Sequence, residues 1–184
     1  ASCGVILPSC ISLAISIPFI FSFHPKLRFD KTWKAFFTSC LTVALFFILW
    51  DVWFTQMGVW GFTPRYLVGV DIINLPLEEW LFFLCIPYAC LFTYHCLKIL
   101  VPKDILGKLA PNFTMFLGIT LLILAILNND KWYTGLTFFL TSIFLFAHLF
   151  IWKSKYLGRF YLAYFAILPF FFLTNGILTG SWIE

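Results

Sequence analysis

The stretch KAFFTSCLTVALFFILWDVW, Lys34–Trp53, decides the fold class, because its only charged residues lie near its two ends. A run of about 20 predominantly apolar residues is long enough to cross the hydrocarbon core of a bilayer as a helix. Spanning segments must be helices or closed barrels, and long apolar runs are typical of helices. One similar run precedes this one and four follow it. The six predicted spans are 5–23, 34–53, 79–100, 113–127, 133–152 and 160–178.

The composition of the whole chain agrees with these spans. The 184 residues are 62% hydrophobic and only 11% charged, whereas a soluble domain has about 25% charged residues. We therefore expect one integral membrane domain over residues 1–184, an all-α polytopic transmembrane helix bundle. The net charge of +4 predicts no nucleic-acid partner, because the basic residues lie in short loops, where anionic lipid headgroups are the expected partners.

The basic residues also predict the orientation of the bundle. All but two of the 12 fall in the loops that follow the first, third and fifth spans, and the exceptions are Arg65 and Lys131. Basic loops stay on the cytoplasmic side of a membrane. This places the N-terminus outside and makes the loop between Asp51 and Glu78 face outward.

Two spans end in similar sequences, which indicates an internal repeat. The second ends in DVWFTQMGVW, starting at Asp51, and the sixth in NGILTGSW, starting at Asn175. Both show an Asp or Asn, then a Thr four residues later, then Gly and Trp. Because the two spans run in the same direction, the repeat is a parallel one, a known plan for membrane proteins.

Two adjacent glutamates, Glu78 and Glu79, are expected to open the third span. Pro76 suits the first turn of that helix, and Asn74 is the expected cap before it. One interpretation is structural, because the helix dipole favours acidic residues at a helix start. The other is catalytic, because carboxyls at a bilayer are costly and mark functional sites. Apolar surroundings and a second carboxylate favour a shared proton, which a general acid needs.

Asp51 and several aromatic side chains surround this pair in the sequence. Asp51 is either an interfacial residue beside an aromatic belt or a bundle-facing one that shares hydrogen bonds with the glutamates. Asp71 lies in a loop with Gly and Pro and is expected to be solvated. The aromatic residues either belong to the belt or line a pocket whose ring faces stabilise a carbocation. They are Trp53, Trp60, Trp80, Phe82 and Phe83.

Other chemistry has little support in the sequence. The six cysteines show no CxxC spacing, and the three histidines have no partner at ligand spacing, so no metal site is predicted. There is no phosphate-binding loop, no nucleotide fingerprint and no nucleophile with an adjacent base. A small transporter would need polar groups at mid-bilayer, and the spans offer little beyond His148.

The motif around the glutamates resembles that of a known family. Two stretches are similar to the small membrane lycopene cyclases. The first runs from Asp51 through Thr55 to the Gly58-Val59-Trp60-Gly61-Phe62 block, and the second is LPLEEWLFF at 75–83. These are the heterodimeric or fused enzymes of some bacteria, archaea and fungi, with a Pro-x-Glu-Glu/Asp motif. The stretch 21–94 looks like the fused flavobacterial type, which implies a bacterial cytoplasmic membrane.

The resemblance implies a fold of seven spans. It assigns residues 1–101 to a first three-helix half, 102–130 to a joining helix and 131–184 to a second half. The last helix of that half, with its own Pro-x-Glu motif, is absent before Glu184. We therefore expect either a longer chain or a second homologous subunit or copy that supplies the motif.

The resemblance also implies a reaction, the redox-neutral cyclisation of lycopene ψ-ends to β-rings without metal or cofactor. Glu78 is expected to donate the proton or to be the donor's immediate partner, with Glu79 as the second member and Asp51 in support. An alternative is a non-catalytic subunit that binds a carotenoid or packs in a larger complex. The substrate-binding residues expected are Pro76, Phe82, Phe83, Trp53, Trp60 and Asn175.

Overall fold

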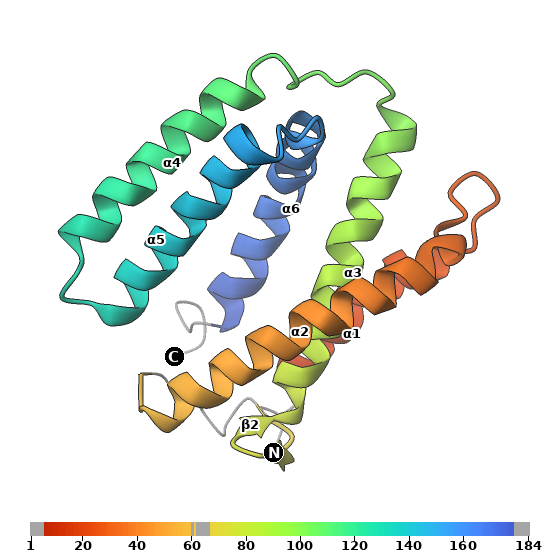
Figure 1. The fold of residues 1–184 in the computed structure, drawn as a ribbon. Helices are drawn as coiled ribbons and strands as arrows, with labels where there is room; N and C mark the ends of the chain where they lie inside the picture. Colours follow the sequence, from red (N-terminus) through yellow and green to blue (C-terminus); the bar gives the residue numbers. More distant parts are fainter. Residues whose placement is uncertain (1–5, 60, 62–66, 179–184) are drawn as a thin grey trace. The chain divides into compact units, whose positions relative to one another are not determined.

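The protein folds as an all-α membrane bundle, as the sequence predicts (Figure 1). The computed structural model describes residues 6–59, 61 and 67–178. Each predicted span corresponds to one α-helix. The boundaries differ by at most three residues, except that the fifth span extends six residues beyond the end of its helix. The helices are α1 (Ile6–Phe21), α2 (Trp33–Gln56), α3 (Leu77–Leu100), α4 (Ala110–Leu127), α5 (Trp132–Phe146) and α6 (Leu157–Leu178).

Four of the segments are long and apolar enough to cross a membrane. They are Phe29–Gln56, Leu77–Leu100, Ala110–Leu127 and Trp132–Ile151, and shorter apolar helices cover Ile11–Phe21 and Leu157–Leu173. Large apolar side chains such as Leu45 and Phe46 are exposed, at 62% and 60%. An exposed apolar surface of this extent is expected for a protein that contacts lipid. The chain is therefore a membrane protein.

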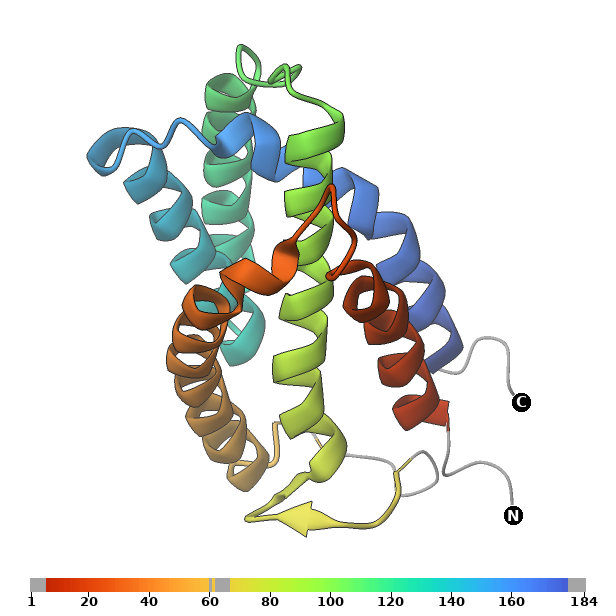
Figure 2. The same cartoon turned by 90° about the vertical axis from the view of Figure 1, so that its right-hand side faces the viewer.

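The chain forms two compact units. The first contains residues 1–100 and 165–184, and the second contains 101–164, so that α6 begins in one unit and ends in the other. In the first unit, α3 lies between α1 and α2 (Figure 2). The 3-10 helix η1 (Phe29–Thr32) leads into α2, and its Phe29 is buried against Tyr88 and Phe92 of α3.

The segment before α3 departs from the prediction. Instead of an irregular loop, it forms a short antiparallel hairpin of β1 (Asp71–Ile72) and β2 (Leu75–Pro76), with Asp71 opposite Pro76. Pro76 ends the hairpin just before the first helical residue, Leu77, and was expected inside the first turn. Asn74 lies in the turn of the hairpin and does not cap the helix, because its Oδ1 has no partner among the described residues. Asp71 is exposed, as expected.

In the second unit, α4 and α5 pack side by side. The fully buried Ser142 of α5 donates a hydrogen bond to the backbone oxygen of Gly118 of α4, at 2.8 Å. A side chain at Gly118 would meet the ring of Phe146, so the glycine permits this close approach. Small residues and interhelical hydrogen bonds of this kind are typical of helix packing in membranes. A π-helical turn, η3 (Ala147–Ile151), continues α5.

Candidate functional site

The hairpin and the loop before it fix the start of α3. The Leu77 amide donates a hydrogen bond to the Val70 oxygen at 2.8 Å, and the Val68 amide donates one to Oε1 of Glu78 at 2.6 Å. Gly69, between these two contacts, has a φ of +87°, a value that favours glycine. The chain thus bends back over the first turn of α3 and covers it.

Glu78 is enclosed by this arrangement. Only 2% of the residue is exposed, and it is one of the most deeply buried polar residues among those described. Its Oε1 accepts the Val68 hydrogen bond, whereas its Oε2 is buried without a hydrogen-bond partner in the described part of the chain. A buried carboxyl oxygen without a partner is costly and needs an explanation. Glu78 therefore has one oxygen that is held by a hydrogen bond and one that is buried without a partner among the described residues.

Glu79 and Asp51 complete a group of three carboxyls. Glu79 follows Glu78 on α3 but is half-buried, as is Asp51 near the end of α2. Asp51 and Glu78 both lie close enough for their negative charges to repel that of Glu79. The structure therefore brings together the three acidic residues that the sequence singled out, from two helices. Consecutive residues on a helix point about 100° apart, which explains why Glu78 and Glu79 differ in burial.

The aromatic residues of the site have different surroundings. The ring of Phe83 stacks on Phe47 of α2, with 6.3 Å between the ring centroids. Phe82 is 37% exposed and Trp53 is 49% exposed, so both rings are accessible from the apolar surroundings. Pro76 is fully buried in β2. Trp60 and the side chain of Asn175 lie outside the described part of the chain.

The sequence does not predict two polar contacts of the site, which involve Asn74 and the Val68 amide. The sequence predicts a helix cap at Asn74, but the Nδ2 of Asn74 donates a hydrogen bond to the Val52 oxygen on α2, at 3.0 Å. The Val68 amide carried no signal, since any residue except proline has one. Among the described residues, only four buried side-chain polar atoms have no partner, and three of them belong to Asn74, Glu78 and Trp80. Unpaired polar atoms are thus concentrated at the start of α3.

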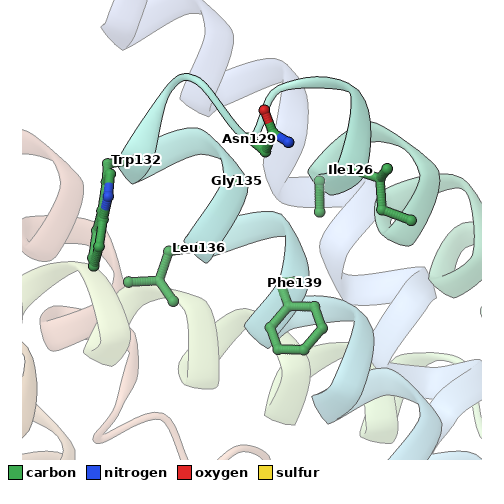
Figure 3. A pocket seen from close by; sticks show the side chains of 7 residues that line it. Ile126, Asn129, Trp132, Gly135, Leu136 and Phe139 are labelled. Atoms are coloured by element: carbon green, nitrogen blue, oxygen red, sulfur yellow. The ribbon is translucent and has the colours of Figure 1, made fainter.

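No other group of acidic residues like that of Asp51, Glu78 and Glu79 was found at the other candidate places in the described structure, which are a pocket and the surroundings of His148. A shallow pocket of about 390 Å³ lies within the second unit, and no acidic or basic side chain lines it (Figure 3). Its lining consists of Ala125, Ile126, Asn129, Trp132, Gly135, Leu136 and Phe139. The rings of Phe144 and Trp152 each lie 4.6 Å from that of His148. No three His, Cys, Asp or Glu side chains gather as metal ligands would among the described residues.

Comparison with known proteins gives one match. The model of a family described as lycopene cyclase matches residues 5–97 and 130–184, which together make up most of the chain. The matched part contains the hairpin, Asp51 and both glutamates. No curated protein and no solved structure matches.

Proposed function

The chain belongs to the lycopene cyclase family, and from this we propose that it cyclises the ψ-ends of lycopene to β-rings within the membrane, in a redox-neutral reaction catalysed by acid. The observation that carries the proposal is the buried Oε2 of Glu78, which has no hydrogen-bond partner among the described residues. The negative charge of Glu79 is repelled by that of Glu78 and also by that of Asp51. A proton source in apolar surroundings is what an alkene substrate requires.

The reaction requires one proton in and one proton out. A carboxylic acid protonates C2 of the terminal C1=C2 bond, and the positive charge appears at the tertiary C1. The electrons of the C5=C6 bond then form the C1–C6 bond, which moves the charge to C5. Loss of a proton from C6 to a carboxylate restores the C5=C6 bond and gives the β-ring. The two proton transfers cancel, so no oxidant or reductant is needed.

The three carboxyls suit these proton transfers. Negative charges that lie close together in apolar surroundings repel one another, and sharing a proton among the carboxyls relieves that repulsion. Glu78 is our candidate for the proton donor or its immediate partner, because its Oε1 is fixed by the Val68 amide while its Oε2 is not engaged. Glu79 is the second member of the pair. Asp51, on the other helix, supports the pair and can share its proton.

The aromatic residues around the glutamates would protect the cation. The partly exposed aromatic residues Phe82 and Trp53 can attract a passing positive charge by a cation–π interaction. Phe83 packs against α2, which favours a role in shaping the wall. Exclusion of water matters in this reaction, because water would add to the cation and give an alcohol.

The organisation of the chain is part of the proposal. We assign residues 1–101 to a first half, 102–130 to a joining helix and 131–184 to a second half. The family match supports this division, because it leaves residues 98–129 unmatched between its two parts. The N-terminus lies outside a bacterial cytoplasmic membrane, and the glutamates lie toward the outer surface.

The test is ring formation in cells that accumulate lycopene. Expression of the full-length protein should turn the cells from red to orange-yellow, with γ- or β-carotene in the extract. Glu78→Gln removes the acid but keeps the size of the side chain, and it should lower ring formation by about 100-fold or more. Asp71→Asn is the matched control, since it removes an exposed carboxylate from the hairpin just before α3 and should leave the product unchanged.

The result also separates the proposal from its alternative. Unchanged ring formation in Glu78→Gln would remove Glu78 from the mechanism. Red cells in which the wild-type protein copurifies with intact lycopene would favour a carotenoid-binding subunit.

A further inference from the structure

Asn74 connects the two helices that carry the carboxyls. It lies in the two-residue turn between β1 and β2, and its Nδ2 donates a hydrogen bond to the backbone oxygen of Val52 in α2. Val52 is the neighbour of Asp51, and Asn74 is four residues before Glu78. The side chain of Asn74 therefore joins the Asp51 end of α2 to the chain that leads directly into the two glutamates.

The turn that holds Asn74 needs such an anchor. Its first residue, Ile73, has a φ of +64°, which is rare for a β-branched side chain and costs free energy. Hairpin turns with a positive φ at this position normally use Gly, Asn or Asp. Strained backbone persists only where surrounding contacts hold it. In this hairpin the surrounding contacts are the buried Leu75 and Pro76, the Leu77 amide bond to Val70 and the Asn74 bond to α2.

We propose that Asn74 is a positioning residue that fixes the distance between Asp51 and the glutamates, and thereby decides which proton the ring cation loses. The inference rests on the proposed cyclase function. Asn74 does not take part in proton transfer itself. It acts through Val52 on one side and through the hairpin on the other. The other amide atom, Oδ1, is buried with no partner among the described residues, so the side chain is enclosed on both sides of its amide.

The products of the reaction report on this distance. The cation at C5 can lose a proton from C6, from C4 or from the attached methyl group, which gives a β-, ε- or γ-ring respectively. Water can also add to the cation before it is deprotonated. A base held at one distance selects one of these outcomes, whereas a base on a loosened helix end selects less well. A defect that only reduces the amount of folded protein lowers all products together.

The test substitutes Asn74→Asp in the full-length protein, expressed in lycopene-accumulating cells. Aspartate has the same shape but places an oxygen against the Val52 oxygen, so the connection is lost. We expect ring formation to fall about 10- to 100-fold, and the fraction of ε-rings, γ-rings and hydroxylated products to rise. Asn74→Ser, which removes the amide without adding charge, makes the same comparison if Asn74→Asp does not fold.

The control is Asn128→Asp. Asn128 also donates its Nδ2 to a backbone oxygen, that of Leu124 at 2.9 Å, but in the second unit. Its substitution should leave the product pattern unchanged. A lower rate with an unchanged product pattern in both Asn74 variants would overturn the inference, as would an equal shift in Asn128→Asp.

Glu78→Gln in the same series distinguishes the two levels of the proposal. If Glu78→Gln abolishes ring formation while the Asn74 variants keep the β-ring pattern, only the positioning role fails. If Glu78→Gln still forms rings, the proposed mechanism fails, and if the wild-type protein forms no rings, both proposals are overturned.

Discussion

At the scale of single residues, Glu78 combines one hydrogen-bonded carboxyl oxygen with one that is buried and has no partner among the described residues. Acidic residues at a helix start are common because the helix dipole stabilises them, and the Val68 hydrogen bond is a contact of that ordinary kind. It accounts for only one oxygen. The dipole alone does not explain why Oε2 is buried without a partner, since an exposed carboxylate would be stabilised as well. The structural and catalytic interpretations of this residue are therefore compatible.

Tyr88 offers a test of the polar contacts in the first unit. Its hydroxyl is 2.5 Å from the hydroxyl of Ser22 and accepts a hydrogen bond from Nε1 of Trp33 at 3.0 Å. Tyr88→Phe leaves the Trp33 donor without this acceptor, so we expect the free energy of unfolding to fall by about 1–3 kcal/mol. Denaturant unfolding in detergent measures this. Tyr156→Phe, at an exposed tyrosine, should be neutral, and equal stability of the two variants would contradict the prediction.

The acidic residues of the site could be predicted from the sequence, whereas their connections could not. Glu78, Glu79 and Asp51 are conspicuous because charge is rare in this chain and each lies at the edge of an apolar run. Asn74 was assigned to the wrong role because local rules favour Asn as a cap before a helix. Its true partner, Val52, lies 22 residues earlier. Contacts between distant segments depend on the folded chain, and a single sequence contains no direct signal for them.

At the scale of helices and strands, the close packing of α4 and α5 gives a second test. A Cβ at Gly118 would lie 2.8 Å from the ring of Phe146. We expect Gly118→Ala to reduce stability by about 1–3 kcal/mol, because the ring must move in a packed interface. Phe146→Leu in the same chain should recover part of the loss, since neighbouring substitutions are not additive. Gly61→Ala, where no described atom lies within 4 Å, is the control, and an equal loss there would contradict the prediction.

The helices were predictable and the hairpin was not, for physical reasons. Hydropathy identifies a spanning helix because lipid requires every backbone group to be paired within the segment. The hairpin has only two residues in each strand, and its turn begins with a strained isoleucine, Ile73. Local preferences argue against such a turn. It exists because the buried Leu75 and Pro76 and the contact with α2 stabilise it, which is a property of the folded unit.

At the scale of the whole molecule, charge predicts how the chain crosses the membrane. Lys153 and Lys155 follow the fifth span, and both belong to the basic loops predicted to remain in the cytoplasm. The turn between α4 and α5 contains one basic residue, Lys131, and is predicted to lie outside. The same distribution of basic residues predicts that the segment before α3 also faces outward. The orientation therefore decides on which side of the membrane the carboxyls can exchange protons with water.

Single cysteines introduced into a cysteine-free variant test this orientation. Asn129→Cys, in the turn between α4 and α5, should react in intact cells with a maleimide that does not cross the membrane. Lys155→Cys should react only after the membrane is made permeable, because basic loops are retained inside. The native Cys85, which is buried within α3, provides an unreactive control when it is restored alone. The reverse pattern would place the N-terminus inside and the glutamates near the cytoplasm, so that the proton for ring closure would come from the cell interior.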